Sequence, residues 1–218
     1  MKVPVPIVCS ACGEKFNLEV IGSDLPEYSQ CPKCRASAYN MWPLGNVVTL
    51  LLMERARQEL AKDDVSLAIL LSAVAVEGEM AYLFFKWKGL DSGKFIGDQT
   101  PEDKRAWEDE WANMRSIGKR LDELSRFLTG KPFDEFARLR KDLLKTALAS
   151  YDPATSIKDF IQESFFELRN DIAHYGKIDF KEPDGTRCLS LGSALLALFH
   201  TMDIERADAM EDTFKKAR

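Results

Sequence analysis

Four cysteines near the start of the chain have the spacing of a metal site. Cys9 and Cys12 form one Cys-x-x-Cys pair, and Cys31 and Cys34 form a second pair after 18 intervening residues. A Cys-x-x-Cys turn directs two sulfurs into one hemisphere, so two such turns supply the corners of a tetrahedron. The separation lies within the range of about 15–20 residues that is typical of zinc sites. The pattern predicts a zinc ribbon with structural zinc on these four cysteines.

Two disulfides, or an iron centre of the rubredoxin kind, would use the same four cysteines. Arg35 and Ala36 follow Cys34, where rubredoxin-like turns favour glycine, and this favours zinc. Four protein ligands leave no open position for catalysis, so the metal would be structural. A segment of about 40 residues has too little core to fold alone, so loss of the metal should unfold it. We interpret the fifth cysteine, Cys188, as a small buried hydrophobic residue.

A second set of candidate residues lies on a predicted helix over residues 156–175. Its apolar stripe is Ile161, Phe165, Leu168 and Ile172. Arg169 borders this stripe, whereas Asn170 and His174 lie four residues apart on a nearly opposite face. On these grounds alone, His174 is a solvated histidine at a helix C-terminus, where a positive ring suits the helix dipole.

The string Arg169-Asn170-Asp171-Ile172-Ala173-His174 resembles the Arg-x4–6-His motif of the HEPN superfamily. The context is similar too, because the motif lies late in a helical chain and the resemblance covers about residues 46–218. It implies a metal-independent endoribonuclease of prokaryotic defence, toxin or RNA-processing systems, with RNA as substrate. Such enzymes usually act as dimers whose motifs meet, so we expect a homodimer through the face of Arg169 and His174.

The resemblance also implies roles for three residues. His174 would be the general base or acid, Arg169 would stabilise charge on the scissile phosphate, and Asn170 would position the substrate or the ring. In-line transfer needs one proton acceptor and one donor, and two copies of His174 across a two-fold axis would supply both. Arg169 lies about 140° from His174 on a straight helix, so Arg169 could instead serve the facing subunit.

Two departures from the family pattern leave an alternative open. Some family toxins have tyrosine two residues after the histidine, whereas here Tyr175 follows directly and Gly176 takes the second position. The motif face also carries Glu163 and Glu167, and carboxylates repel phosphates. The alternative function is a catalytically silent binding or scaffold protein, in which the zinc ribbon contacts nucleic acid or a protein partner.

Two glutamates in the apolar segment from Val65 to Phe85 are predicted to have different surroundings. Glu77 lies among apolar side chains and needs a partner, for which Arg169 is the candidate. Glu79 shares a face with polar neighbours, which predicts that it is solvated. His200 follows an apolar run and is interpreted as a packed or partly exposed core histidine.

The periodicity predicts a mainly α protein, an antiparallel helical bundle with a small N-terminal β domain. We place the zinc ribbon at residues 1–40 and the HEPN-like bundle at 41–218. Asp184-Gly185 predicts a β-hairpin turn within residues 178–189. The expected helices are residues 46–61, 64–88, 101–127, 133–149, 156–175 and 191–216.

Charge and composition restrict the possible partners and location. Thirty basic and 35 acidic residues give a net charge of −5 over 218 residues, which excludes a uniformly basic nucleic-acid-binding surface. The segment from Val65 to Phe85 contains Glu77 and Glu79, so we expect a buried helix and no membrane span. We expect no signal peptide, and cysteines in metal-type spacing favour a reducing, cytoplasmic compartment.

Overall fold

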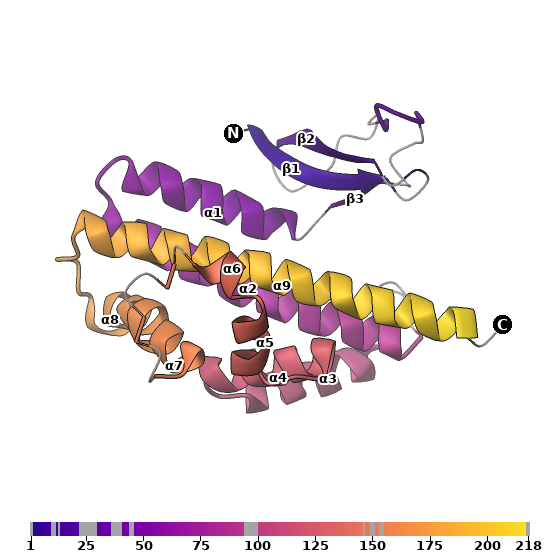
Figure 1. The fold of residues 1–218 in the computed structure, drawn as a ribbon. Coiled ribbons are helices and arrows are strands. Elements are labelled where there is room, and N and C mark those ends of the chain that lie inside the picture. Colours follow the sequence, from indigo (N-terminus) through magenta and orange to yellow (C-terminus); the bar gives the residue numbers. More distant parts are fainter. Residues whose placement is uncertain are drawn as a thin grey trace.

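The computed structural model contains a helical body with a small β-sheet beside it (Figure 1). It describes residues 2–9, 12, 14–21, 30–35, 41–43, 46–93, 100–145, 147–148, 151–152 and 155–216. Most of these residues are helical, which confirms the mainly α class. The helices are α1 (Val47–Leu60), α2 (Val65–Asp91), α3 (Pro101–Asn113), α4 (Ile117–Thr129), α5 (Phe133–Leu139), α6 (Lys141–Leu144), α7 (Ile157–Ile161), α8 (Glu167–Tyr175) and α9 (Glu182–Lys216).

The sheet has three antiparallel strands in the order β2–β1–β3. They are β1 (Lys2–Cys9), β2 (Lys15–Ile21) and β3 (Met41–Pro43). Ile7 of β1 lies opposite Phe16 of β2 on one side and Pro43 of β3 on the other. Because β1 ends at Cys9 and β2 begins soon after Cys12, the sheet fixes the position of the first cysteine pair.

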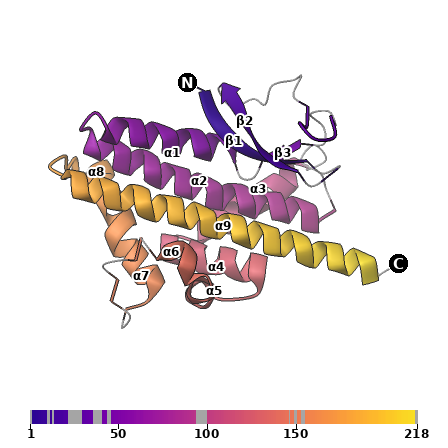
Figure 2. The same ribbon diagram turned by 45° about the horizontal axis from the view of Figure 1, so that its top comes forward.

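Helices α1, α2 and α9 pack side by side and form the long axis of the molecule (Figures 1 and 2). Asn46 and Asp64 cap the first two helices, each accepting a hydrogen bond from a backbone N–H of the first turn. Most of the shorter helices α3 to α8 lie on one side of this layer, below α2 and α9 in Figure 1. The core between them is aromatic, and its largest fully buried side chains include Phe133, Phe136, Phe165, Phe166 and Phe199.

The helix expected over residues 101–127 is interrupted, and this prediction was wrong. Helix α3 ends at Asn113, Met114 is buried, and Ser116 caps α4 by accepting the Lys119 N–H at 3.2 Å. The Arg120 Nε–H donates to the Met114 carbonyl at 2.9 Å, which satisfies a backbone acceptor at the break. The helix expected over residues 133–149 is also shorter, because α5 and α6 end at Leu139 and Leu144.

The hairpin expected within residues 178–189 is absent, because α9 begins at Glu182 and includes Asp184 and Gly185. Gly185 has a packing role: a Cβ at this position would lie 2.6 Å from Cδ1 of Leu60. The glycine therefore lets α9 approach the end of α1 closely. Cys188, one turn later, is fully buried as expected, and burial raises the pKa of its thiol to about 12.

Helix α2 is the one described helix long and apolar enough to cross a membrane, with a mean hydropathy of 1.7 over its most apolar window. Of that window, 56% is buried within the fold. Helices α1, α4, α8 and α9 all contact α2. This packing agrees with the buried helix expected from the two glutamates.

The prediction that Glu79 is solvated was wrong, because the residue is buried, with 4% of its surface exposed. Its Oε2 accepts the Asn46 backbone N–H at 3.2 Å. Burial raises the pKa of Glu79, while hydrogen bonds from Thr49 and Asn46 oppose that rise. Glu79 thus ties the first residue of the helical body to the centre of α2.

The raised pKa of Glu79 makes stability depend on pH. The pKa of Glu79 is higher in the folded protein than in the unfolded chain. At pH values between these two pKa values the folded protein therefore binds more protons than the unfolded chain, so its stability falls as pH rises from about 4.5. The free energy of unfolding of the wild type should therefore decrease relative to that of Glu79→Gln between pH 4.5 and 7.5. Urea unfolding at several pH values measures this difference, and parallel curves would contradict the assignment.

Candidate functional site

The four cysteines converge at the end of the β-sheet. Cys9 closes β1, and its backbone N–H donates to the Glu14 carbonyl at 2.9 Å. The second pair lies in a turn closed by the Arg35 N–H, which donates to the Cys31 carbonyl at 2.9 Å. The Sγ atoms of Cys9 and Cys34 are 3.6 Å apart, as are those of Cys12 and Cys31. All four Sγ atoms lie within 4.8 Å of one another.

These distances fit a metal ion better than disulfides. A disulfide needs an S–S distance of about 2.05 Å, so the sulfurs are too far apart to be bonded. A tetrahedron with metal–sulfur bonds of about 2.3 Å has edges of about 3.8 Å, close to the observed separations. The four cysteines could therefore hold one metal ion.

The thiols also influence one another's ionisation. Backbone N–H groups of Cys34 and Lys33 lower the pKa of Cys31 to about 7. The backbone N–H of Glu14 lowers the pKa of Cys12, but burial and the other three cysteines outweigh it and raise this pKa to about 12. Four thiolates so close together repel one another, and a divalent cation would offset that repulsion.

The helix that carries the second candidate set contains a π-helical turn, Gln162–Phe166, between α7 and α8. The extra residue in this turn allows the adjacent Phe165 and Phe166 both to be buried. Ile161 and Ile172 are buried as expected, and Leu168 packs against the core. The stripe was therefore predicted correctly.

Arg169 and Asn170 meet on the side of this helix that faces α2. The Arg169 Nη1–H donates to Oδ1 of Asn170 at 2.9 Å, and Nη2 lies 3.4 Å from Oε1 of Glu77. The ion pair confirms the partner expected for Glu77. Both of its side chains are about three-quarters buried, with 28% and 24% exposed. The contacts hold the guanidinium at the wall of a cleft.

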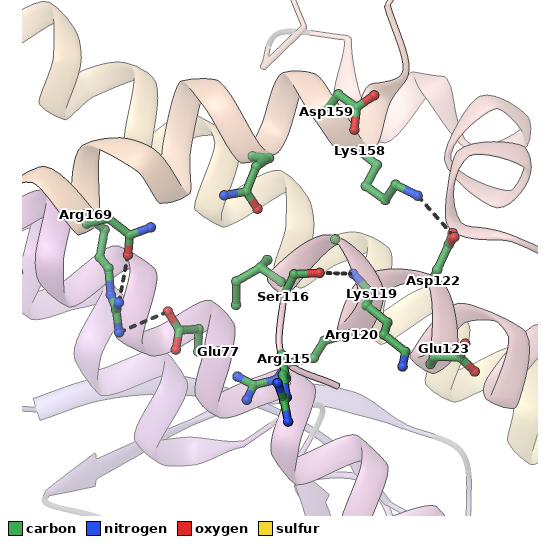
Figure 3. Close-up of a pocket in the computed structure, with 14 residues that line it drawn as sticks. Glu77, Arg115, Ser116, Lys119, Arg120, Asp122, Glu123, Lys158, Asp159 and Arg169 are labelled. Atoms are coloured by element: carbon green, nitrogen blue, oxygen red, sulfur yellow. Dashed lines mark hydrogen bonds and ion pairs between the residues drawn. The ribbon is translucent and has the colours of Figure 1, made fainter. Parts of the chain in front are cut away.

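The cleft lies between α2, α4 and the α7–α8 helix and has a volume of about 780 Å³ (Figure 3). Its basic residues are Arg115, Lys119, Arg120, Lys158 and Arg169, and its acidic residues are Glu77, Asp122, Glu123 and Asp159. The amides of Gln162 and Asn170 complete the polar wall. With five basic and four acidic groups, the cleft is strongly polar and nearly neutral.

His174 lies outside this cleft. It is exposed in the last turn of α8, and Gly176, in the left-handed conformation, caps the C-terminus of this helix. Asp171 is paired with Lys177 at 3.4 Å. Tyr175 is 81% exposed and Ile178 77% exposed beside it. One chain thus brings Arg169 and Asn170 together and places His174 on a neighbouring surface.

Sequence reasoning missed most of the cleft. Arg115 and Lys119 enter it because the chain breaks at Ser116, and Lys158 enters through an ion pair with Asp122 at 3.1 Å. The one local signal was the serine, a good N-cap residue five positions after Trp111, the last tryptophan of the expected helix. His200 is half-buried and lines a smaller cavity, of about 260 Å³, beside Glu79.

No family model, no curated protein and no solved structure matches the chain. The fold and the cysteine cluster define a class: a mainly helical protein with four cysteines that could bind a metal ion.

Proposed function

We propose that the protein is a metal-independent endoribonuclease of HEPN type that acts as a homodimer. The observation that carries the proposal is the pairing of Arg169 with Asn170 at the wall of an open polar cleft, with His174 exposed on the same helix. RNA is the substrate, and the cellular role lies in prokaryotic defence, toxin activity or RNA processing. The protein acts in the cytoplasm.

The chemistry is an attack within the RNA strand. One histidine takes the proton of a ribose 2′-hydroxyl, the 2′-oxygen bonds to the adjacent phosphorus, and the bond from phosphorus to the 5′-oxygen breaks. A second histidine gives its proton to the leaving 5′-oxygen. The products are a 2′,3′-cyclic phosphate and a 5′-hydroxyl. Arg169 stabilises the added charge on the phosphate, and Asn170 holds the guanidinium through its side-chain oxygen.

A dimer would supply the second histidine. Each chain has His174 and His200, and His200 is half-buried beside Glu79. Two copies of His174 at a two-fold axis provide the acid and the base. The exposed Tyr175 and Ile178 beside His174 offer apolar area for such an interface.

The N-terminal cysteine cluster completes the proposal as a zinc ribbon. Cysteine thiolates in tetrahedral arrangement suit zinc, which would be structural here. The ribbon would contact RNA or a protein partner. Exposed Lys33 of the second cysteine turn pairs with Glu14 at 3.1 Å.

A second candidate is a catalytically silent binding or scaffold protein. Two observations favour it: Glu77 neutralises Arg169, and His174 is absent from the cleft that Arg169 lines. In this case RNA or a protein would bind without being cut.

The shared site can be tested with a heterodimer of one wild-type and one His174→Ala protomer, purified through two different tags. If both histidines act in one site, RNA cleavage per heterodimer should fall far below half of the wild-type rate, because either the acid or the base is missing. A wild-type dimer carrying the same two tags is the control. A rate of about half would mean independent sites, and a monomeric protein that cleaves RNA would contradict the shared site.

A further inference from the structure

Two basic residues of the cleft have no carboxylate partner among the described residues. Arg169 pairs with Glu77, and Lys158 pairs with Asp122. The Arg120 guanidinium is fixed by the Met114 carbonyl and lies 4.9 Å from the centre of the Trp111 ring. Arg115 and Lys119 are exposed and flank the Ser116 cap, with their side chains at the cleft (Figure 3). These two cations remain available for an anion.

Two carboxylates of the cleft are equally available. Glu123 and Asp159 are exposed and form no ion pair in the part of the chain that the structure describes. They line the cleft with the amides of Gln162 and Asn170. A continuous run of phosphates would meet these carboxylates and be repelled. A ligand with one phosphate and several N–H donors would match both sets of charges.

We propose that the cleft binds one nucleotide, with its phosphate on Arg115 and Lys119 and its base edge on Asp159, Glu123 and Gln162. The proposal deepens the ribonuclease function, since an RNA strand would place one extruded nucleotide there, next to Arg169. A free nucleoside monophosphate has the same chemistry. The volume of about 780 Å³ lies in the range that takes small organic ligands, and a duplex is too wide to enter.

The carboxylates predict which base is preferred. Guanine presents an N1–H and an N2 amino group on one edge, and both can donate to a carboxylate. Uracil presents a single N–H between two carbonyls, which face the carboxylates unfavourably. Guanylate should therefore bind most tightly and uridylate most weakly, with a difference of about tenfold or more.

Calorimetric titration of the full-length protein with GMP, AMP, CMP and UMP tests this site. The double variant Arg115→Ser with Lys119→Ser should weaken GMP binding by about tenfold or more, because two charge-assisted contacts are lost. The control, Arg138→Ser with Lys141→Ser, removes the same charge from exposed positions of α5 and α6. Asp159→Asn should reduce the preference for GMP over UMP. Equal effects of the two double variants, or no binding of any nucleotide or RNA, would overturn the proposal.

A second titration separates the two sources of the nucleotide and isolates this inference from the proposed cleavage. Single-stranded RNA carrying 2′-O-methyl groups lacks the attacking hydroxyl, so it binds without being cut. RNA binding that the Arg115/Lys119 variant weakens together with GMP binding identifies a nucleotide of an RNA strand. RNA binding that this variant leaves unchanged, while GMP binding is weakened, identifies a free nucleotide. If the protein binds unmodified RNA without cleaving it, the nucleotide site is supported and the nuclease is contradicted. If RNA is cleaved equally well by the Arg115/Lys119 variant, the nuclease is supported and the nucleotide site is contradicted.

Discussion

If the four cysteines hold a metal ion, its removal is expected to unfold the N-terminal sheet and leave the helical body folded. The sheet and its cysteine turns have little core of their own, so the free energy of metal binding is largely their folding free energy. For small structural zinc sites this binding amounts to about 10–16 kcal/mol near neutral pH. Amide exchange should therefore accelerate in β1 and β2 after chelation, while circular dichroism stays strongly helical. Metal analysis should give one ion per chain before chelation.

Cys31→Ser should have the same effect, because it removes one of the four ligands that converge at the end of the sheet. The matched control is Cys188→Ser, which changes the same kind of residue in the core of α9 and should keep the metal. Full metal content in Cys31→Ser would show that the cluster does not bind as a unit. Loss of the helical signal on chelation would show that the body depends on the metal as well.

Replacement of His174 by alanine is expected to slow RNA cleavage by about 10²–10⁴-fold, the usual contribution of a general acid or base. His174 is exposed, so its removal should leave the fold and its stability nearly unchanged. The rate is measured under single-turnover conditions with a mixed RNA pool, and circular dichroism checks the fold.

His200→Gln is the control for this variant, because His200 is the second histidine of the chain and lies near Glu79. It should retain most of the cleavage rate. An unchanged rate in His174→Ala, or an equal loss in both variants, would remove His174 from the catalytic role and favour the binding protein.

The sequence predicted those features of the structure that depend on short stretches of the chain. The four cysteines meet because each Cys-x-x-Cys turn fixes two sulfurs, and because Cys9 ends β1 and Cys12 shortly precedes β2. The partner of Glu77 was also predictable, because a carboxylate among apolar side chains needs a cation. Whether Arg169 and His174 act in catalysis stays a prediction, since one chain does not contain the interface that would join them.

The errors occurred where tertiary packing determines the structure. Glu79 is predicted to be solvated because the residues on its face of the helix are polar. Helix α2, however, is covered by other helices on several sides, so the positions of polar residues around the helix do not identify an exposed face. Gly185 follows an aspartate, as in a tight turn, yet it serves close contact between α9 and Leu60. The break before Ser116 has no proline or glycine to mark it. That break places Arg115 and Lys119 in the cleft, so most of the cleft was hidden from sequence reasoning.

The chemical ends of the RNA products test the central claim most directly. Unmodified RNA is incubated with the folded protein shortly after addition of excess EDTA, while the N-terminal sheet is still intact, and the fragments are analysed by mass spectrometry. Attack by the 2′-hydroxyl predicts fragments that end in a 2′,3′-cyclic phosphate and begin with a 5′-hydroxyl, and these should be absent with His174→Ala. Uncut RNA would contradict the proposed reaction. So would fragments with 3′-hydroxyl and 5′-phosphate ends that form without EDTA and are absent when EDTA is present.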